Sequence, residues 1–265
     1  MPFKKFSEIP KKLFDLSNPP KELFYQGNLD LTLFDNCAAV VGSRRMTDYG
    51  RQVIEKLVPQ LVFEKKTIVS GFMYGTDQYA HKVCLDNGGK TIAVLGWGID
   101  KKLTDYDEKL SQQIIEGRGL LVSEWENQEG TQWTFPMRDR IIAALATEVF
   151  ITEAAEKSGA LITAKYAQKL KRKIWAVPGP ITSKTSVGTN NLIATGKAQM
   201  WTGTPIQQVL ISDDPILKAL ENESLTTSEI ARKLNRTVAD IGAEISILLL
   251  SGKVTERGGK YFLVT

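Results

Sequence analysis

The fold is decided by the segment CAAVVGSRR at residues 37–45, in which five small or β-branched apolar residues lead into glycine, serine and two arginines. A short apolar run of this kind is typical of a strand buried within a parallel sheet. A helical pattern follows, with apolar residues at spacings of three and four from Tyr49 to Leu61. The segment therefore predicts a strand, a loop at its carboxyl end and a crossover helix.

The same unit recurs along the first 200 residues. Further short apolar runs begin near Lys66, Thr91, Leu120, Glu148 and Ile174, and helical patterns separate them. The interval of about 25 to 30 residues fits one strand plus one crossover helix. We expect an α/β fold, with a Rossmann-like, mainly parallel sheet and helices on both faces.

Three segments are expected along the chain. Residues 1–28 read as an N-terminal arm, with a short helix, packed on the main domain, and residues 29–213 as the Rossmann-like domain. The alternating pattern ends around residues 206–214, where Asp213-Asp214-Pro215 indicates a linker or turn. Residues 214–265 then form a small C-terminal domain.

The C-terminal pattern is that of a winged helix. Helices are expected at residues 216–221, at 228–234 behind Thr227 as N-cap and at 238–250, followed by a hairpin around Gly258-Gly259. The segment carries seven residues of each charge sign, whereas a duplex-binding surface should be basic. A protein contact or a structural role is favoured, and duplex recognition stays an alternative.

The bulk composition sets few limits. The chain has 265 residues, 42% of them hydrophobic and 24% charged, which is ordinary for a globular protein. Its net charge of +4 tolerates a polyanionic partner without requiring one. Cys37 and Cys84 read as buried thiols of a reducing compartment, and no apolar run is long enough for a membrane helix. We expect a cytoplasmic protein without membrane contact.

The loops that follow the predicted strands carry the chemistry. They contain Gly42-Ser43-Arg44-Arg45, Gly71 to Gly75, and Gly96-Trp97-Gly98. In open α/β sheets ligands bind at the carboxyl ends of the strands, where glycines, helix starts and arginines suit phosphate. The chain lacks both the dinucleotide motif G-x-G-x-x-G after its first strand and the P-loop motif. We expect an anion site without cofactor or metal.

A second cluster interleaves cations with aromatic rings. Trp133, Phe135, Pro136, Arg138 and Arg140 lie within eight residues at a predicted helix start. This combination is typical of sites that bind single-stranded nucleic acids, because cations follow the backbone while rings stack on unpaired bases. Further stacking candidates are Trp97, Phe72 and Tyr74, although Phe72 and Phe135 could equally be core residues. The helix start at Ser158-Gly159, with Thr163 and Lys165, is expected to face the same crevice.

A catalytic interpretation is weaker. His81 is the sole histidine of the sequence and lies on a predicted helix, where a structural hydrogen bond is favoured over general-base work. Asp77 and Glu153 could form the carboxylate pair of a nucleotide hydrolase. The favoured alternative is that Asp77 caps its own helix and Glu153 pairs with an arginine. An enzyme or sensor for a nucleotide-like small molecule therefore stays open as the rival function.

These motifs, taken in order, resemble the DprA/Smf DNA-processing family over roughly residues 8–200. The likeness rests on Val41-Gly42-Ser43-Arg44, Ser70-Gly71, Gly75-x-Asp77, Ala80-His81, Val94-Leu95-Gly96-x-Gly98-x-Asp100, Ser123-Glu124, Phe135-Pro136-x-Arg138-x-Arg140-Ile141-Ile142, Glu153-Ala154, Ser158 to Ala164, Val177-Pro178-Gly179 and Asn191-Leu192-Ile193. The resemblance implies a homodimer that binds single-stranded DNA and loads the RecA recombinase in natural transformation. It also implies that residues 42–44 and 135–140 line the DNA pocket.

The chain departs from the family pattern at several positions. Asp139 stands where the family usually has Asn, and would weaken a positive pocket unless an arginine pairs with it. Thr76 replaces the usual aliphatic residue, and the expected Tyr-Pro appears as Tyr106-Asp107. The expected DNA-binding residues are Gly42, Ser43, Arg44, Arg45, Gly71, Phe72, Gly75, Gly96, Trp97, Phe135, Pro136, Arg138, Arg140, Ser158, Gly159, Thr163 and Lys165.

Overall fold

The computed structural model describes residues 2–203, 214–220, 223–250 and 253–263. The chain divides into two compact units, residues 1–203 and 204–265. Most of the linker expected at residues 206–214 lies outside the described part of the chain. None of the described helices is long and apolar enough to cross a membrane.

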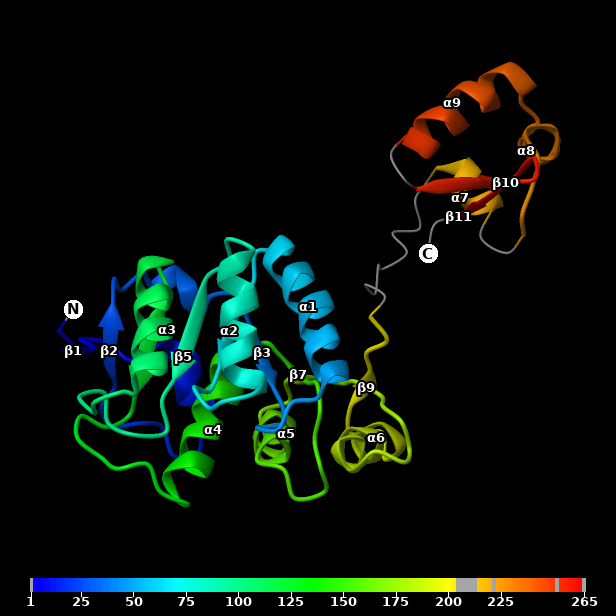
Figure 1. Ribbon diagram of the computed structural model, residues 1–265. Coiled ribbons are helices and arrows are strands. Elements are labelled where there is room, and N and C mark those ends of the chain that lie inside the picture. The colour runs from blue at the N-terminus through cyan, green and yellow to red at the C-terminus, as the bar shows by residue number, and fades with distance from the viewer. Residues whose placement is uncertain (1, 204–213, 221–222, 251–252, 264–265) are drawn as a thin grey trace. The chain divides into compact units, whose positions relative to one another are not determined.

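The larger unit is built on a nine-stranded sheet (Figure 1). In spatial order its strands are β1 (Lys4–Lys5), β2 (Phe24–Gly27), β6 (Leu120–Ser123), β5 (Thr91–Val94), β4 (Thr67–Ser70), β3 (Cys37–Val41), β7 (Glu148–Ile151), β8 (Lys173–Ala176) and β9 (Gln199–Met200). All neighbours from β6 to β9 are parallel, and β1 and β2 add an antiparallel edge. The predicted α/β fold with a mainly parallel sheet is confirmed.

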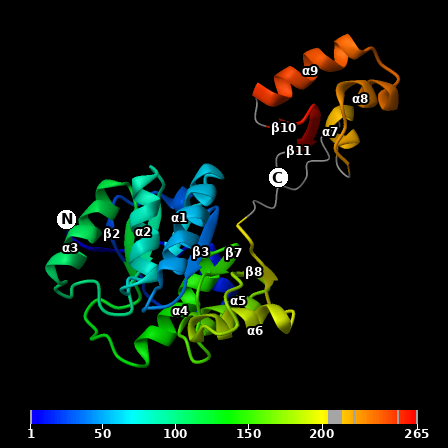
Figure 2. The same ribbon diagram turned by 45° about the vertical axis from the view of Figure 1, so that its right-hand side comes forward.

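Helices cover both faces of this sheet, as Figures 1 and 2 show. One face carries α1 (Asp48–Phe63), α2 (Thr76–Asp86) and α3 (Asp105–Glu116), and the other carries α4 (Thr134–Leu145) and α5 (Ala160–Lys169). Successive strand residues point to opposite faces, so Val40 packs in the cluster of α1 and α2, while Val41 packs in that of α4 and α5. Both faces of β3 are therefore buried, which explains its wholly apolar sequence.

The N-terminal segment belongs to the main domain. It contributes the 3₁₀-helices η1 (Lys11–Asp15) and η2 (Leu31–Phe34), and Leu13 and Leu23 are buried in the core. The expected arm is in fact partly a strand, because β2 pairs antiparallel with β6. After β8 come η3 (Lys184–Ser186) and α6 (Val187–Ala194).

The strand order of the sheet reverses between β3 and β7. Strands β4, β5 and β6 follow β3 to one side, whereas β7, β8 and β9 extend to the other. The loops after β3 and β7 therefore leave the sheet toward opposite faces, and the place where they part is the usual ligand position in open α/β sheets. The loop that begins at Gly42 lies at this point.

The smaller unit contains α7 (Pro215–Ala219), α8 (Thr227–Leu234), α9 (Val238–Leu250) and the hairpin of β10 (Val254–Arg257) and β11 (Lys260–Leu263). Gly258 and Gly259 form the hairpin turn with positive φ angles of 61° and 77°. The N-cap of α8 is Thr226 and not Thr227 as predicted, since Thr226 forms a capping box with Glu229. The elements follow the expected order, and the winged-helix assignment stays a prediction.

Candidate functional site

The loop at the carboxyl end of β3 exposes two cations. Arg44 and Arg45 are both exposed, and the backbone N–H of Arg45 donates to the Ser43 hydroxyl at 3.0 Å. The Arg44 guanidinium carbon lies 4.9 Å from the centre of the Phe135 ring, a cation–π contact. The structure thus brings together the two segments that the sequence singled out, residues 42–45 and the start of α4.

The loop before α2 packs directly on this first loop. Gly75 has a φ of +84°, and a Cβ added there would lie 2.5 and 2.6 Å from the carbonyl oxygens of Arg44 and Ser43. The backbone N–H of Thr76 donates to the Ser43 carbonyl at 3.1 Å. Only glycine fits this position, because a side chain would be strained and would collide with the backbone.

Two buried hydroxyl groups flank Gly42 beneath the loop. A Cβ at Gly42 would lie 2.5 Å from Thr152 Oγ1 and 2.6 Å from Thr76 Oγ1. Within the described residues, neither hydroxyl has a hydrogen-bond partner. Two buried hydroxyls without a partner in the described part of the chain thus lie below the exposed pair of arginines.

A row of aromatic rings continues from Phe135. Its ring is 6.3 Å from that of Trp97 in an edge-to-face arrangement, and Trp97 is 6.4 Å from Phe72. Phe72 is 1% exposed and belongs to the core, whereas Trp97 and Phe135 are half-buried. Gly96 makes room for this row, since a Cβ there would lie 2.5 Å from the Phe135 ring. Gly96 therefore packs against a protein side chain.

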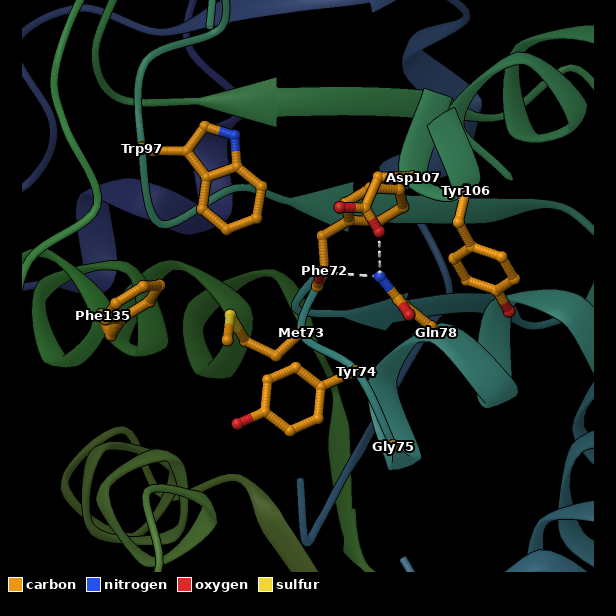
Figure 3. A pocket seen from close by; sticks show the side chains of 9 residues that line it. All are labelled: Phe72, Met73, Tyr74, Gly75, Gln78, Trp97, Tyr106, Asp107 and Phe135. Atoms are coloured by element: carbon orange, nitrogen blue, oxygen red, sulfur yellow. Dashed lines mark hydrogen bonds between the residues drawn. The ribbon is translucent and has the colours of Figure 1, made fainter. Parts of the chain in front are cut away.

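A pocket of about 510 Å³ opens beside this row (Figure 3). Its lining consists of Phe72, Met73, Tyr74, Gly75, Gln78, Trp97, Tyr106, Asp107 and Phe135. Gln78, Tyr106 and Asp107 are not among the residues predicted for the site. The available signal was that Tyr106 and Asp107 begin α3, the helix after β5, and so lie at the same edge as the glycine loops.

The two arginines of α4 are buried, each 3% exposed. Arg138 donates through Nε to Asp139 at 3.1 Å and through Nη1 to the Val94 carbonyl. Arg140 binds both carboxylate oxygens of Glu124, at 2.5 and 2.7 Å. Neither guanidinium is displayed as the free phosphate ligand that the sequence suggested. Pro136 lies in the first turn of α4, where no backbone donor is needed.

Asp139 has the arginine partner that its position requires. Burial raises the pKa of its carboxyl, and the Arg138 and Arg44 charges oppose that rise. The adjacent Asp77 is buried as well, and burial raises its pKa to about 6 against the lowering effect of Arg138. Both acids interact with the buried Arg138. They are therefore not free negative charges beside the exposed arginines of the loop.

His81 has the structural role that the sequence favoured. Burial lowers its pKa to about 4, so the ring is neutral. Its Nε2 donates to the Gly71 carbonyl at 2.7 Å, and Nδ1 contacts the Thr91 hydroxyl at 2.6 Å. A Cβ at Gly71 would lie 2.2 Å from Asp77 Oδ2 and 2.4 Å from Arg138 Nη1. Gly71 is thus enclosed by protein groups.

The predicted partners of the Glu153 and Asp77 carboxylates are not the ones found in the structure. Glu153 accepts hydrogen bonds from the Thr47 backbone N–H at 3.0 Å, the Thr47 hydroxyl at 2.6 Å and the Thr185 hydroxyl at 3.1 Å, in place of an arginine. Asp77 accepts from the Met73 N–H at 3.4 Å, ahead of its helix, in place of capping it. The two acids thus have separate partners and separate structural roles.

The start of α5 follows β7 at the same sheet edge. The Ser158 hydroxyl accepts from the Ala160 N–H at 3.4 Å, Gly159 and Lys165 are exposed, and Thr163 is buried. In the described part of the chain, no hydrogen bond, ion pair or ring contact links these four residues to Arg44 or Phe135. Their share in the site therefore stays a prediction.

Comparison with known proteins gives consistent matches. The family model described as DNA recombination-mediator protein A matches residues 3–211. DNA processing protein DprA of Streptococcus pneumoniae is 39% identical over 198 residues, which cover 74% of this chain and 69% of that protein. Protein Smf of Synechocystis is 36% identical over 217 residues, 80% of this chain but 52% of the relative, so the chain spans about half of that protein's length.

A solved structure supports the same relation. DNA processing protein A of Helicobacter pylori, described for its single-stranded DNA binding mode, matches with a TM-score of 0.67 and 32% identity. The match covers 75% of this chain and 90% of that one.

Proposed function

This chain belongs to the DNA recombination-mediator protein A family, as its resemblance to DprA/Smf proteins predicted, and on that premise we propose that its larger unit binds single-stranded DNA. The proposed binding surface is the carboxyl edge of the sheet around β3. The Helicobacter relative, 32% identical, is described as binding single-stranded DNA, which supports the proposal.

The contact of Arg44 with Phe135 carries this proposal. An exposed guanidinium lies 4.9 Å from a half-buried ring, near the β3–β7 junction where open α/β sheets usually bind ligands. A strand with unpaired bases needs both groups side by side, because the cation binds the phosphate while the ring stacks on a base. Arg45 and Ser43 add donors for the same phosphate track.

The remaining predicted residues receive two kinds of role. Arg138 and Arg140 are buried with Asp139 and Glu124, so we assign them to positioning α4 and its Phe135. The glycines of the loops make room for those side chains. Ser158, Gly159, Thr163 and Lys165 are proposed to extend the track past β7.

The wider function is proposed from the family. The protein is proposed to protect incoming DNA, to load the RecA recombinase in natural transformation and to act as a homodimer, while the C-terminal unit serves a protein contact or a structural role. Loading is tested by RecA assembly on a strand already covered by single-strand binding protein. A chain that binds the strand without accelerating this assembly would contradict the loading role.

The experiment for strand binding is fluorescence anisotropy with labelled oligo-dT of increasing length, at two salt concentrations. A strand binder gains affinity over several nucleotides and loses it steeply with salt. The rival nucleotide enzyme or sensor would instead bind a mononucleotide as tightly as the oligomer. Equal affinity for dTMP and a long oligo-dT would therefore reject strand binding in favour of the rival.

A further inference from the structure

The pocket beside Phe135 contains polar groups that the proposed phosphate contacts do not use. Its volume of about 510 Å³ lies within the range of roughly 300–1,000 Å³ found for small-molecule sites. Phe135 and Gly75 line the pocket and also contact the loop of Arg44. A strand held at Arg44 therefore runs beside the mouth of the pocket.

Exposed aromatic rings form the walls of this pocket. Tyr74 is 57% exposed and Tyr106 is 64% exposed, and the half-buried Trp97 and Phe135 line the same space (Figure 3). Trp97 and Phe135 pack edge to face, while Tyr74 and Tyr106 come from other elements, so rings from different loops and helix starts surround the space. Walls of this kind accept a flat aromatic ligand, because every nucleic-acid base has a face that stacks.

The polar side of the pocket begins with Gln78. Its amide nitrogen donates to Asp107 Oδ1 at 2.6 Å and to the Phe72 carbonyl at 3.3 Å, the two bonds dashed in Figure 3. Both partners can only accept, so the orientation of the amide is fixed. The oxygen of Gln78 is therefore left as a hydrogen-bond acceptor.

Asp107 supplies a second acceptor. It is the third residue of α3, a position where a carboxylate often bonds back to the N-cap backbone. Here its side chain is bonded to Gln78 of α2 instead, while its own N–H donates to the N-cap Thr104. Figure 3 shows the other carboxylate oxygen directed away from Gln78. A negative carboxylate repels a phosphate, so the pocket suits an uncharged base that donates hydrogen bonds.

We propose that this pocket takes one unstacked base of the bound strand and prefers guanine. Guanine presents two adjacent donors, N1–H and the N2 amino group, to a carboxylate. Adenine and cytosine offer one amino group beside an acceptor nitrogen, and thymine offers one N–H between two carbonyls. The inference rests on the proposed binding of single-stranded DNA and adds base selectivity to it.

The test compares labelled oligo-dT with the same oligomer carrying a single dG, dA, dC or deoxyinosine. A single dG avoids the multistranded structures of guanine runs, and a sliding strand can place it in the pocket. The expected result is an affinity gain of roughly five-fold or more for dG, the lower end of discrimination by a bidentate pair. Deoxyinosine, which lacks the N2 amino group, gains less.

Asp107→Asn turns one acceptor into a donor at constant size, and the ratio of dG to dT affinity is expected to fall to about one. Glu108→Gln is the matched control, because it removes the same charge at the next, exposed residue outside the pocket. The control should keep the wild-type preference.

The outcomes separate the two proposals. Equal affinities for the dT and dG oligomers, with steep salt dependence retained, would overturn the base pocket and leave strand binding intact. A dG preference that survives in Asp107→Asn would overturn the assignment to this carboxylate. Failure of every oligomer to bind would overturn strand binding and the pocket together.

Discussion

The Gly96→Ala substitution tests whether the position of the Phe135 ring matters for binding. The new Cβ would lie 2.5 Å from Cδ1 and 2.9 Å from Cε1 of Phe135, whereas ordinary contact begins at 3.4 Å. The ring must therefore retreat by about 0.9 Å, which disturbs its present contacts with Arg44 and Trp97. Overpacking of this kind costs about 1–3 kcal/mol of folding free energy.

The effect on binding follows from the stacking contribution. Stacking on one aromatic ring contributes about 1–3 kcal/mol, so a displaced ring should cost roughly five-fold or more in affinity for oligo-dT. Anisotropy titrations measure the affinity, and urea unfolding measures the stability at the same temperature. The variant is titrated only where it is fully folded.

Gly242→Ala, at a residue outside the proposed DNA-binding surface, is the matched control for this substitution. A Cβ at Gly242 meets nothing within 4 Å, and the residue lies inside helix α9, so alanine should leave stability equal or raise it slightly. Wild-type affinity in a Gly96→Ala protein that is clearly destabilised would refute the placement of Phe135 against the strand.

Three further predictions concern buried groups and a helix cap. The neutral His81 contributes stability that is present above pH 6.5 and is lost as the pH falls to about 4. This loss of roughly 3 kcal/mol should be absent from urea unfolding of His81→Asn. Equal pH dependence of the unfolding free energy in both proteins would contradict the prediction. Arg140→Gln breaks the buried pair with Glu124 and should cost about 3–5 kcal/mol in the same melts, whereas unchanged stability would reject a structural pair. Thr226→Ala removes the cap of α8 and should cost about 1 kcal/mol, read from hydrogen exchange of the α8 amides. Thr227→Ala is its control. An equal loss of stability in Thr227→Ala would contradict the assignment of Thr226 as the N-cap.

Much of the fold could be predicted because its strands are buried on both faces. An apolar run such as residues 37–41 has few alternatives when a glycine loop and a helical pattern follow it. Strand β2 was missed because its four residues gain their pairing from β6, almost a hundred residues away. Its sequence, Phe24 to Gly27, carries no repeating pattern of its own.

The sequence predicted only part of the candidate site, because it does not reveal which way each side chain points. The spacing of Arg138 and Arg140 already argues against a shared role, because residues two apart on a helix do not share a face. The two side chains in fact meet different carboxylates. The contact of Gln78 with Asp107 joins α2 to α3 over 29 residues, and no local pattern could reveal it. The departure at Tyr106-Asp107 was visible, but its meaning depended on that packing.

The central claim is that Arg44 binds the phosphate of a single strand, and the salt dependence of binding tests it most directly. The affinity for labelled oligo-dT is measured across a salt series for the wild type, for Arg44→Ala and for Arg118→Ala, which removes an exposed arginine just before β6 at the opposite edge of the sheet. The account predicts that Arg44→Ala weakens binding and reduces the slope of log affinity against log salt by about 0.7, while Arg118→Ala matches the wild type. An unchanged affinity and slope for Arg44→Ala would contradict it.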